Sequence, residues 1–534
     1  MTSSRFIHLY DSTLRDGAQT LGVYFRTDDK RRITTLLDEF GIDFIEGGWP
    51  SANPTDDAFF ADIPQRRHAH VMAFGMTHKK GRTAQDDPQL QALVQSDADG
   101  FCIVGKCWDF HVEHTLHVGL EDNLRMIADS VAFLRTTGKR VIFDGEHFFD
   151  GYKQNRTYAM ECLQAAAHHD AHCLVLCDTN GGSMPDHIAH VTNDVVRQQG
   201  NIPIGIHCHN DMGLATANSL AAVEAGARHV QGTFNGLGER CGNADLVSII
   251  PTLVYKMGYQ TNISQERLRE LTFYAHAIDH VINRLPSPSA PYVGTRAFAH
   301  KGGLHSAAVM KNPLSYEHID PARVGNQRQL IVSNQAGKTG IRSLLETHTP
   351  PLHANDAQLD NIASLIKQKE FQGYSYDKAD ASCILLARSI IHPNHPRPFA
   401  VKDYHVTTCQ DSSTANVTIQ TPDEKTYSCE KITEEGPFHA LDSALRCVLQ
   451  PLFPSLSRLT LSDYKVLILP QGENTAATTR VMITFTYHDA PECSTIGVSA
   501  NIIHASWEAL LDAFYWALMY DEAEQNNAHA ISAS

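Results

Sequence analysis

Two histidines, His207 and His209, stand at the end of the apolar run at residues 202–206. Alternate side chains of a β-strand point to the same face, so both imidazoles are predicted to point the same way. Neutral imidazole is a common metal ligand, and two histidines at this spacing can bind one ion without distortion of the backbone. A bare pair of this kind also occurs as hydrogen-bonded core residues, so a metal site requires further ligands nearby.

The first half of the chain repeats a short β-rich segment followed by an amphipathic one. The predicted strands are residues 6–10, 44–46, 70–74, 101–104, 140–143, 173–176, 202–206 and 230–234. Predicted helices between them include residues 27–40, 121–134, 156–168 and 214–225. Eight strand–helix units of roughly 25 to 40 residues predict an α/β fold, the TIM (β/α)8 barrel.

The active site of such a barrel lies at the carboxyl ends of the strands, and polar residues gather there in this sequence. They are Arg15, Asp16, Glu46, Glu146, Thr179, His207, His209 and Asn243. Helix caps and turns explain single members of this set but not the whole set on one rim, which favours a metal site. Asp16, His207, His209 and Asn243 would supply two nitrogen and two oxygen ligands and leave positions open for a bidentate substrate. Such a set suits Mn, Zn, Mg or Co and does not select among them.

The composition limits the partners and the compartment. The chain has 534 residues, 44 Lys plus Arg, 60 Asp plus Glu and a net charge of −16, without a basic block, which argues against nucleic acid or an anionic membrane. The N-terminus lacks the apolar core of a signal peptide, and no stretch approaches the roughly 18 to 20 apolar residues that span a bilayer. We expect a cytoplasmic protein whose twelve cysteines, which form no CxxC pair, are buried and reduced.

Two proline-rich segments, at residues 285–291 and 392–398, mark breaks between domains. The barrel is expected at residues 1–275, a mostly helical linker region at 276–398, an α+β domain at 399–520 and a disordered polar tail at 521–534. In the α+β domain, the patterns predict strands at 404–409, 414–419, 464–469 and 479–487 and helices at 440–449 and 505–519.

The motif D-x-T-L-R-D-G at residues 11–17 identifies a family resemblance. From Asp11 to about Leu518, the chain resembles the acyl-CoA-using aldol synthases, the family of 2-isopropylmalate, homocitrate and citramalate synthases. The segments 46–50, 146–152 and 373–376 look most like the citramalate synthase branch. The family motif often continues with Glu after the Gly, whereas Ala18 stands here and offers no carboxylate.

The resemblance implies roles for the rim residues. Asp16, His207 and His209 would be metal ligands, and Asn243 would occupy the fourth protein position. Arg15 and Thr179 would hold a 2-oxo acid, with Glu146 beside it, and we also assign Glu46 to substrate binding. His305 and Tyr316 match positions that assist catalysis from the linker region of the partner subunit in a homodimer.

The C-terminal domain resembles the family's regulatory domain through residues 436–442 and 497–502. In relatives, this domain binds the end-product amino acid of the pathway, so isoleucine is the expected inhibitor. From the residues alone, these glycine-containing segments could equally be plain loops.

The resemblance implies a reaction that joins acetyl-CoA, pyruvate and water to give (R)-citramalate and CoA on the route to 2-oxobutanoate and isoleucine. The general base stays open among Glu146, His305 and Tyr316. An alternative is a synthase for a larger 2-oxo acid, 2-oxoisovalerate or 2-oxoglutarate, with Lys106 and His78 as conceivable partners of the additional group. A different class is a catalytically inactive barrel that senses an amino acid.

Overall fold

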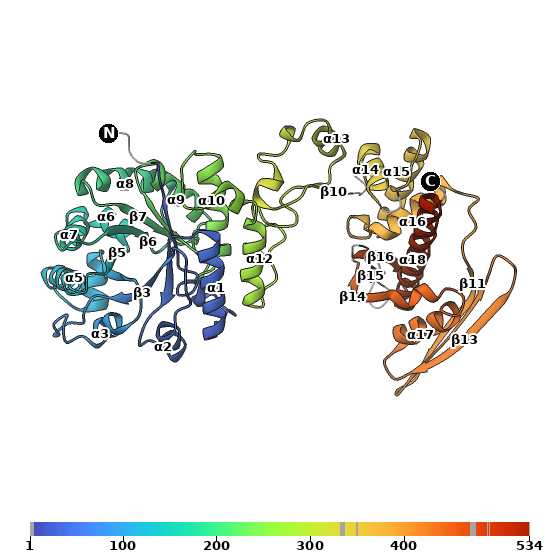
Figure 1. Ribbon diagram of the computed structural model, residues 1–534, viewed down its shortest axis with the longest axis horizontal. Helices are drawn as coiled ribbons and strands as arrows, with labels where there is room; N and C mark the ends of the chain where they lie inside the picture. The colour runs from blue at the N-terminus through green and yellow to red at the C-terminus, as the bar shows by residue number, and fades with distance from the viewer. Residues whose placement is uncertain are drawn as a thin grey trace. The chain divides into compact units, whose positions relative to one another are not determined.

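The chain forms two compact units. The computed structural model describes residues 5–331, 337–348, 351–469, 477–488, 490 and 492–532. The first unit comprises Met1–Phe298 with Ile319–Gln327, and the second comprises Ala299–His318 with Arg328–Ser534 (Figure 1).

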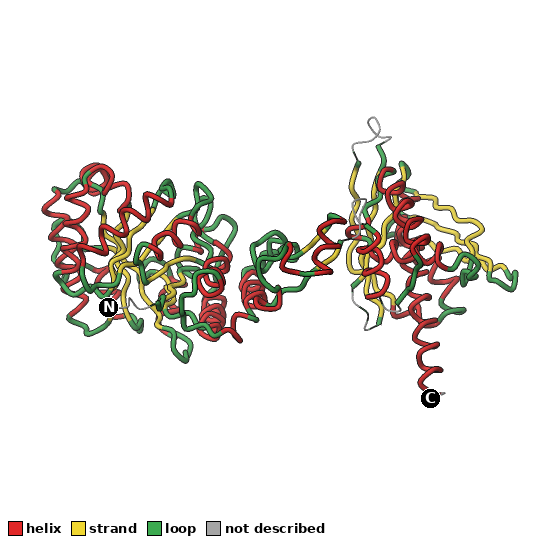
Figure 2. Tube along the Cα trace, turned by 90° about the horizontal axis from the view of Figure 1, so that it is seen from above, coloured by secondary structure: helices red, strands yellow, loops and turns green. Residues whose placement is uncertain are grey.

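The first unit is a closed barrel of eight parallel strands in sequence order, which confirms the predicted TIM barrel. The strands are β1 (His8–Asp11), β2 (Phe44–Gly48), β3 (His70–Met76), β4 (Gly100–Lys106), β5 (Arg140–Glu146), β6 (Cys173–Asp178), β7 (Ile204–Cys208) and β8 (His229–Gly232). Each of the eight predicted strands overlaps one of them. Figure 2 shows the helices around the outside of these strands.

Helices connect the strands of the barrel, and three more follow β8 in the same unit. They are α1 (Thr27–Phe40), α2 (Pro54–Ala61), α3 (Pro88–Gln95), α4 (Asp109–His111), α5 (Leu120–Arg135), α6 (Phe148–Gln154), α7 (Arg156–Ala167), α8 (Pro185–Gln199), α9 (Ala215–Glu224), α10 (Leu246–Tyr255), α11 (Gln265–Leu268) and α12 (Leu271–Val281). The first of them shows how the sequence sets these elements. Ile33, Leu37 and Phe40 recur on one face of α1 and are buried, and the helix ends at Gly41, whose φ of 112° suits glycine.

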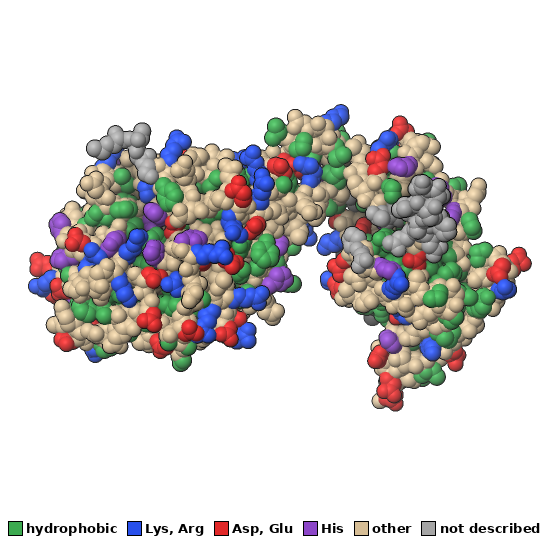
Figure 3. Space-filling view, in the orientation of Figure 1, with side chains coloured by type: hydrophobic (Ala, Val, Ile, Leu, Met, Phe, Trp, Pro, Cys, Tyr) green, Lys and Arg blue, Asp and Glu red, His purple; other side chains and the backbone are tan. Residues whose placement is uncertain are grey.

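The barrel interior contains its own apolar cluster below the rim. Tyr10, Met72, Phe74, Cys102 and Val175 belong to it, and Trp49 and Val104 pack against it. Inward-pointing residues nearer the carboxyl ends are polar, so the strands present their reactive groups above a packed floor. On the face shown in Figure 3, basic and acidic side chains are interspersed over this unit.

The second unit begins with the linker region, which is mostly helical as predicted. Its helices are α13 (Gly303–Lys311), α14 (Lys338–Thr347), α15 (Asp356–Phe371) and α16 (Asp380–Ile391), and a short parallel pair joins β9 (Ala299–His300) to β10 (Gln329–Leu330). The limit at residue 275 that we expected for the barrel domain falls inside α12, and the first compact unit continues to Phe298.

The C-terminal part consists of two βββα segments, in agreement with the predicted α+β domain. The first has β11 (Ala400–Thr408), β12 (Ser413–Gln420), β13 (Thr426–Thr433) and α17 (Pro437–Leu449). The second has β14 (Leu459–Ile468), β15 (Thr479–Tyr487), β16 (Cys493–Ser499) and α18 (Ile502–Ser532). Both sheets are antiparallel. The sequence did not predict β13 and β16 as strands, because charged residues interrupt the alternation in β13 and β16 contains Gly497.

The C-terminal tail differs from the expectation. It was predicted to be disordered from Asp521, but α18 continues to Ser532. Its Ala, Glu and Gln residues are strong helix formers, and this propensity outweighs the polarity of the segment. Ala533 and Ser534 lie outside the described residues.

The cysteines were expected to be reduced and buried. Cys429 on β13 and Cys447 on α17 instead form a disulfide, because the helix packs against that strand and brings the two sulfurs together. Cys241 and Cys409 are free but exposed, and the other free cysteines are buried. Among the described residues, no helix combines the length and the apolar character needed to cross a membrane.

Candidate active site

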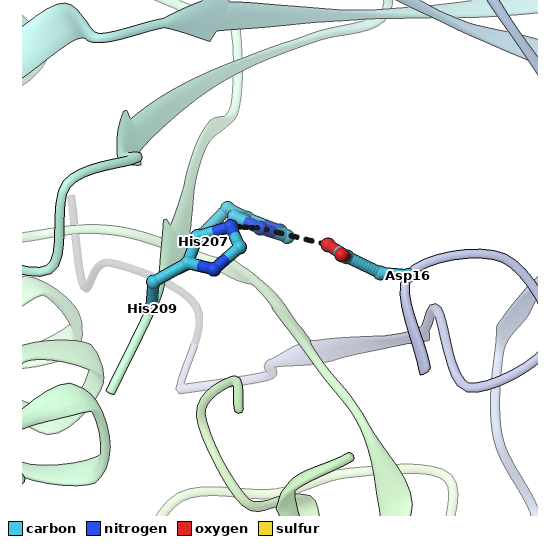
Figure 4. Close-up of side chains that lie close together, drawn as sticks. All are labelled: Asp16, His207 and His209. Carbon is cyan, nitrogen blue, oxygen red and sulfur yellow. Dashed lines mark hydrogen bonds and ion pairs between the residues drawn. The ribbon is translucent and has the colours of Figure 1, made fainter. Parts of the chain in front are cut away.

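Three of the four predicted metal ligands form a buried cluster at the carboxyl end of the barrel. The Nε2 atom of His207 lies 3.3 Å from Oδ2 of Asp16 and 3.4 Å from Nε2 of His209. One ligand atom from each residue lies within 4.8 Å of the others, and Figure 4 shows the three side chains turned toward one point. All three residues are at least 90% buried, so water competes little with these groups for an ion.

A tight turn after β1 places Asp16. The backbone N–H groups of Arg15, Asp16 and Gly17 all donate to the carbonyl oxygen of Ser12. The buried carboxylate of Asp11 secures the start of this turn, because it accepts hydrogen bonds from the backbone and the hydroxyl of Thr13. Burial raises the pKa of Asp11 to about 7 even though these hydrogen bonds lower it.

Asn243, the fourth predicted ligand, is placed beside His209 by backbone pairing. The two residues form an antiparallel bridge, and Ala244 N–H donates to the carbonyl of Cys208 at 2.9 Å. Both side-chain amide atoms of Asn243 and Nδ1 of His209 are buried, and they have no hydrogen-bond partner among the described residues. Buried polar atoms without partners are costly, so this corner of the site fits a ligand that completes them.

The electrostatics of the cluster suit a cation. Burial lowers the pKa of His209 to about 3, and the positive charge of neighbouring His207 contributes to this shift, so His209 is neutral at pH 7. Burial opposes ionisation of Asp16, but Arg15 and His207 hold the pKa of its carboxyl well below the usual value. Two imidazoles, an ionised carboxylate and an amide oxygen form a donor set that divalent Mn, Zn, Mg or Co accepts, and the residues present fit such an ion.

Arg15 is held in place rather than solvated. Its Nε donates to Oε2 of Glu46 at 2.7 Å, and its guanidinium carbon lies 3.9 Å from the centroid of the Phe74 ring. The other carboxylate oxygen of Glu46 accepts a hydrogen bond from the hydroxyl of Tyr10 at 2.7 Å. Glu46 is fully buried, and both of its oxygens are engaged by the protein. Nη1 of Arg15 lies 3.5 Å from Oδ2 of Asp16, so the guanidinium faces two carboxylates of the site.

Glu146 and Thr179 lie on the same rim with different partners. Glu146 forms an ion pair with Lys106, its neighbour in the register of β4 and β5. The hydroxyl oxygen of Thr179 accepts a hydrogen bond from the backbone N–H of His147 at 2.9 Å. Because that bond uses a lone pair, the Thr179 hydroxyl hydrogen is free to donate to a ligand.

His305 and Tyr316 belong to the second unit, where the fold brings them together. Their rings stack with centroids 4.2 Å apart, and both side chains are exposed. The pair belongs to a different compact unit from the metal-ligand cluster. Its catalytic role, and its supply by a partner subunit, stay predictions.

The structure also shows a site residue that sequence reasoning missed. Gln231 on β8 is fully buried and lies between Nδ1 of His207 and the carboxylate of Asp144. The alternation along β8 makes it an inward-facing position, but only the pairing of β7 with β8 shows that it stands next to His207 in register.

Comparison with known proteins agrees with the fold. Residues 6–273 match the HMGL-like family, residues 292–373 match the homocitrate synthase post-HMGL domain-like family, and residues 378–518 match the LeuA allosteric (dimerisation) domain. The chain belongs to the HMGL-like family, as a condensing acyltransferase of the group that contains the 2-isopropylmalate, homocitrate and citramalate synthases.

Similar proteins extend along nearly the whole chain. The (R)-citramalate synthase of Aquifex aeolicus is 43% identical over 532 residues, which cover 97% of this chain and 99% of that protein. The (R)-citramalate synthase of Sulfolobus acidocaldarius is 40% identical over 521 residues, with 97% and 98% covered. A probable 2-isopropylmalate synthase of Methanopyrus kandleri is 29% identical over 509 residues, with 95% and 97% covered.

Proposed function

We propose that this enzyme is a citramalate synthase, which condenses acetyl-CoA with pyruvate and water to give (R)-citramalate and CoA on the route to isoleucine. The observation that carries the proposal is the buried cluster of Asp16, His207 and His209 next to an arginine that Glu46 holds in place. The identity of more than 40% with citramalate synthases over almost full length supports pyruvate as the 2-oxo acid.

The residues of the rim would bind and orient the 2-oxo acid. The Arg15 guanidinium, oriented by Glu46, suits the carboxylate of pyruvate, and the Thr179 hydroxyl can donate a further hydrogen bond to it. A divalent ion held by Asp16, His207, His209 and Asn243 would polarise the ketone carbonyl. Because Glu46 has no free oxygen, its part in substrate binding is to fix the orientation of Arg15.

Carbon–carbon bond formation then requires removal of a proton from the acetyl methyl group. The resulting enolate attacks C2 of pyruvate, the ketone oxygen takes up a proton, and the product of this step is citramalyl-CoA. Water then attacks the thioester carbonyl, the C–S bond breaks with its electron pair staying on sulfur, and a proton from the water passes to that sulfur, which gives citramalate and the thiol of CoA. The base is one of Glu146, His305 and Tyr316, and Glu146 forms an ion pair with Lys106.

The contacts of Lys106 and His78 speak against a larger, doubly charged substrate. The charge of Lys106 is compensated by Glu146. Nε2 of His78 lies 3.9 Å from Oδ2 of Asp129 on α5, and Nδ1 contacts the carbonyl of Lys79. Neither residue offers an uncompensated cation to the second carboxylate that 2-oxoglutarate would bring.

Release of CoA tests this proposal. Purified enzyme with Mn²⁺ or Mg²⁺ and acetyl-CoA is incubated separately with pyruvate, 2-oxobutyrate, 2-oxoisovalerate and 2-oxoglutarate, and the free thiol is followed over time. The fastest release is expected with pyruvate. A clear preference for 2-oxoisovalerate or 2-oxoglutarate would replace the proposed substrate, and no release with any acid would favour the amino-acid sensor.

We also propose that the enzyme is a homodimer that pairs through its C-terminal βββα segments. The edge strands β13 and β14 expose Ile432, Leu467 and Ile468, which are 68%, 48% and 74% exposed. Exposed apolar residues on sheet edges favour association with another chain. Sedimentation of the wild type should give a dimer, and Ile432→Lys with Ile468→Lys should shift it toward the monomer; a wild-type monomer at micromolar concentration would reject this arrangement.

Isoleucine is the proposed inhibitor, and a cavity of about 1090 Å³ in the second unit supports an amino-acid effector. Its lining combines apolar side chains such as Leu385 and Leu511 with Arg397 and Asp512, which suit a carboxylate and an ammonium group. Isoleucine should inhibit CoA release at concentrations at which alanine does not. Equal inhibition by unrelated amino acids would contradict the assignment.

A further inference from the structure

A hydrogen-bonded chain inside the barrel connects a proposed metal ligand to a carboxylate on the far side. Nδ1 of His207 lies 2.9 Å from Oε1 of Gln231, and Nε2 of Gln231 lies 3.0 Å from Oδ1 of Asp144. The three residues come from β7, β8 and β5, and each is at least 95% buried. Water has no access to substitute for any of these partners.

The donor and acceptor capacities give this chain a direction. An ionised carboxylate only accepts hydrogen bonds, so Asp144 requires the NH₂ group of the Gln231 amide. The amide oxygen of Gln231 then faces Nδ1 of His207, which must carry the hydrogen. In the neutral imidazole that a metal ligand requires, the lone pair is then on Nε2, the atom that faces Asp16 and His209.

We infer that Gln231 is a positioning residue of the metal centre, which is anchored by Asp144 and holds His207 in the tautomer and ring orientation that present the Nε2 lone pair to the ion. The inference rests on the proposed metal centre and extends it to two residues that do not touch the ion. Groups that hold the second nitrogen of a ligand histidine commonly change metal affinity about 10- to 100-fold when they are removed.

The first test removes the amide at nearly constant volume. Gln231→Met leaves His207 without an acceptor for Nδ1, so the affinity for Mn²⁺, measured by competition with a chelator, should fall about 10- to 100-fold. The visible absorption of the Co²⁺-loaded protein should change as well. The matched control is Asn218→Leu, which removes another fully buried amide of the same unit, one that bonds to the carbonyl of Ser183 and contacts no proposed ligand. The control should bind Mn²⁺ within about twofold of the wild type.

The second test exchanges the amide and the carboxylate of the chain, which reverses the hydrogen bond between positions 231 and 144 but keeps the hydrogen on Nδ1 of His207. In Asp144→Asn, the amide of Gln231 can bond in either orientation, so both tautomers of His207 are populated and the Mn²⁺ affinity should fall several-fold. Adding Gln231→Glu places a group that only accepts beside His207, while the new amide at position 144 donates to it. The double variant should recover the affinity to within about threefold of the wild type, which loss of packing alone would not allow.

Three results separate the possible failures. If His207→Ala binds Mn²⁺ as the wild type does, the metal centre itself is wrong. If His207→Ala loses the ion but Gln231→Met keeps wild-type affinity, only the positioning role of Gln231 is overturned. If the double variant binds no more tightly than Asp144→Asn, the direction of the chain is overturned.

Discussion

In the barrel, every strand from β2 to β8 is buried along most of its length, and carboxylates, an arginine and imidazoles stand among apolar side chains in its interior. In the C-terminal part of the second unit, the central strands β12 and β15 alternate buried with partly exposed residues, and their core is almost wholly apolar. The barrel uses both faces of its strands, whereas each C-terminal sheet buries only one face under a helix.

This difference separates two physical tasks. Burying Glu46, Asp16 and Arg15 costs desolvation free energy, and the cost is offset only where each charge meets an opposite charge or a donor. The barrel therefore gives up some folding stability to hold the charged groups of the proposed active site in a fixed arrangement. The C-terminal sheets keep their polar groups near water, and β13 and β14 lie at their edges.

The largest loss of activity should come from a substitution among the buried polar residues that distinguish the barrel from the second unit. Asp16→Ala removes a proposed ligand and a counter-charge of Arg15, so turnover should fall more than about 1000-fold and bound Mn²⁺ should be lost. Circular dichroism should stay unchanged. Asp28→Ala, which alters an exposed carboxylate on α1, is the control. Retention of activity in Asp16→Ala would remove the basis of the metal assignment.

A variant in the second unit tests whether the two units share one site. His305→Ala should lower kcat by roughly a few hundredfold while Mn²⁺ stays bound, since its stacked partner Tyr316 and the barrel ligands are intact. Mixed with inactive Arg15→Ala protein, it should recover about a quarter of the wild-type activity, because one site in each mixed dimer combines an intact barrel with an intact linker. Confirmed mixed dimers without recovery would show that the sites are not shared.

The disulfide lies within the second unit and should stabilise that unit alone. Cys429 and Cys447 close a loop of 18 residues, for which chain entropy gives about 3 kcal/mol. Cys447→Ser, or reduction with dithiothreitol, should therefore destabilise the C-terminal sheets and leave the barrel unchanged, as read by hydrogen exchange of peptides from each unit. Cys409→Ser, at an exposed free thiol, is the control. Equal loss of protection in both units would mean that they unfold together.

Glu46→Gln tests whether the buried charge of Glu46 fixes the orientation of Arg15. The variant removes the counter-charge of Arg15 but no group that we assign to direct contact with pyruvate. We expect kcat/KM for pyruvate to fall roughly 30-fold, mainly through KM, which corresponds to about 2 kcal/mol of hydrogen bonding to a charged group. The KM for acetyl-CoA should stay the same. An equal rise in both KM values would point to general damage rather than to Arg15.

The smallest expected effect is on the free energy of unfolding of the barrel at acidic pH. Burial lowers the pKa of His229 to about 3, so between pH 6.5 and 3 the unfolded chain binds a proton that the folded barrel does not. Its contribution to stability is present above pH 6.5 and is lost as the pH falls. Between pH 7 and 5.5 the wild type should lose about 1.3 kcal/mol that His229→Gln does not lose, measured by urea unfolding. Identical pH slopes would contradict the lowered pKa.

Much of the barrel could be predicted because its signals are local. The run at residues 202–206 and its counterparts are short, apolar and regularly spaced, and each became one strand of the barrel. The helix predicted at residues 27–40 has the same bounds in the structure. Local signals failed where neighbours decide the conformation. The edge strand β13 is held by pairing with β12. The final turns of α18 were missed for another reason, because the polarity of the segment was weighed above its helix propensity.

The sequence by itself determined which residue types stand at the strand ends, and so the set of Asp16, His207, His209 and Asn243. Only the tertiary structure decided how they are supported. Gln231 and Asp144 are 87 residues apart, and Arg15 and Glu46 are 31 apart. Whether such pairs meet depends on barrel closure and on the register of neighbouring strands, which the pattern of one strand does not contain. For the same reason, the sequence did not predict the disulfide between β13 and α17, because it forms only where the helix packs on the sheet.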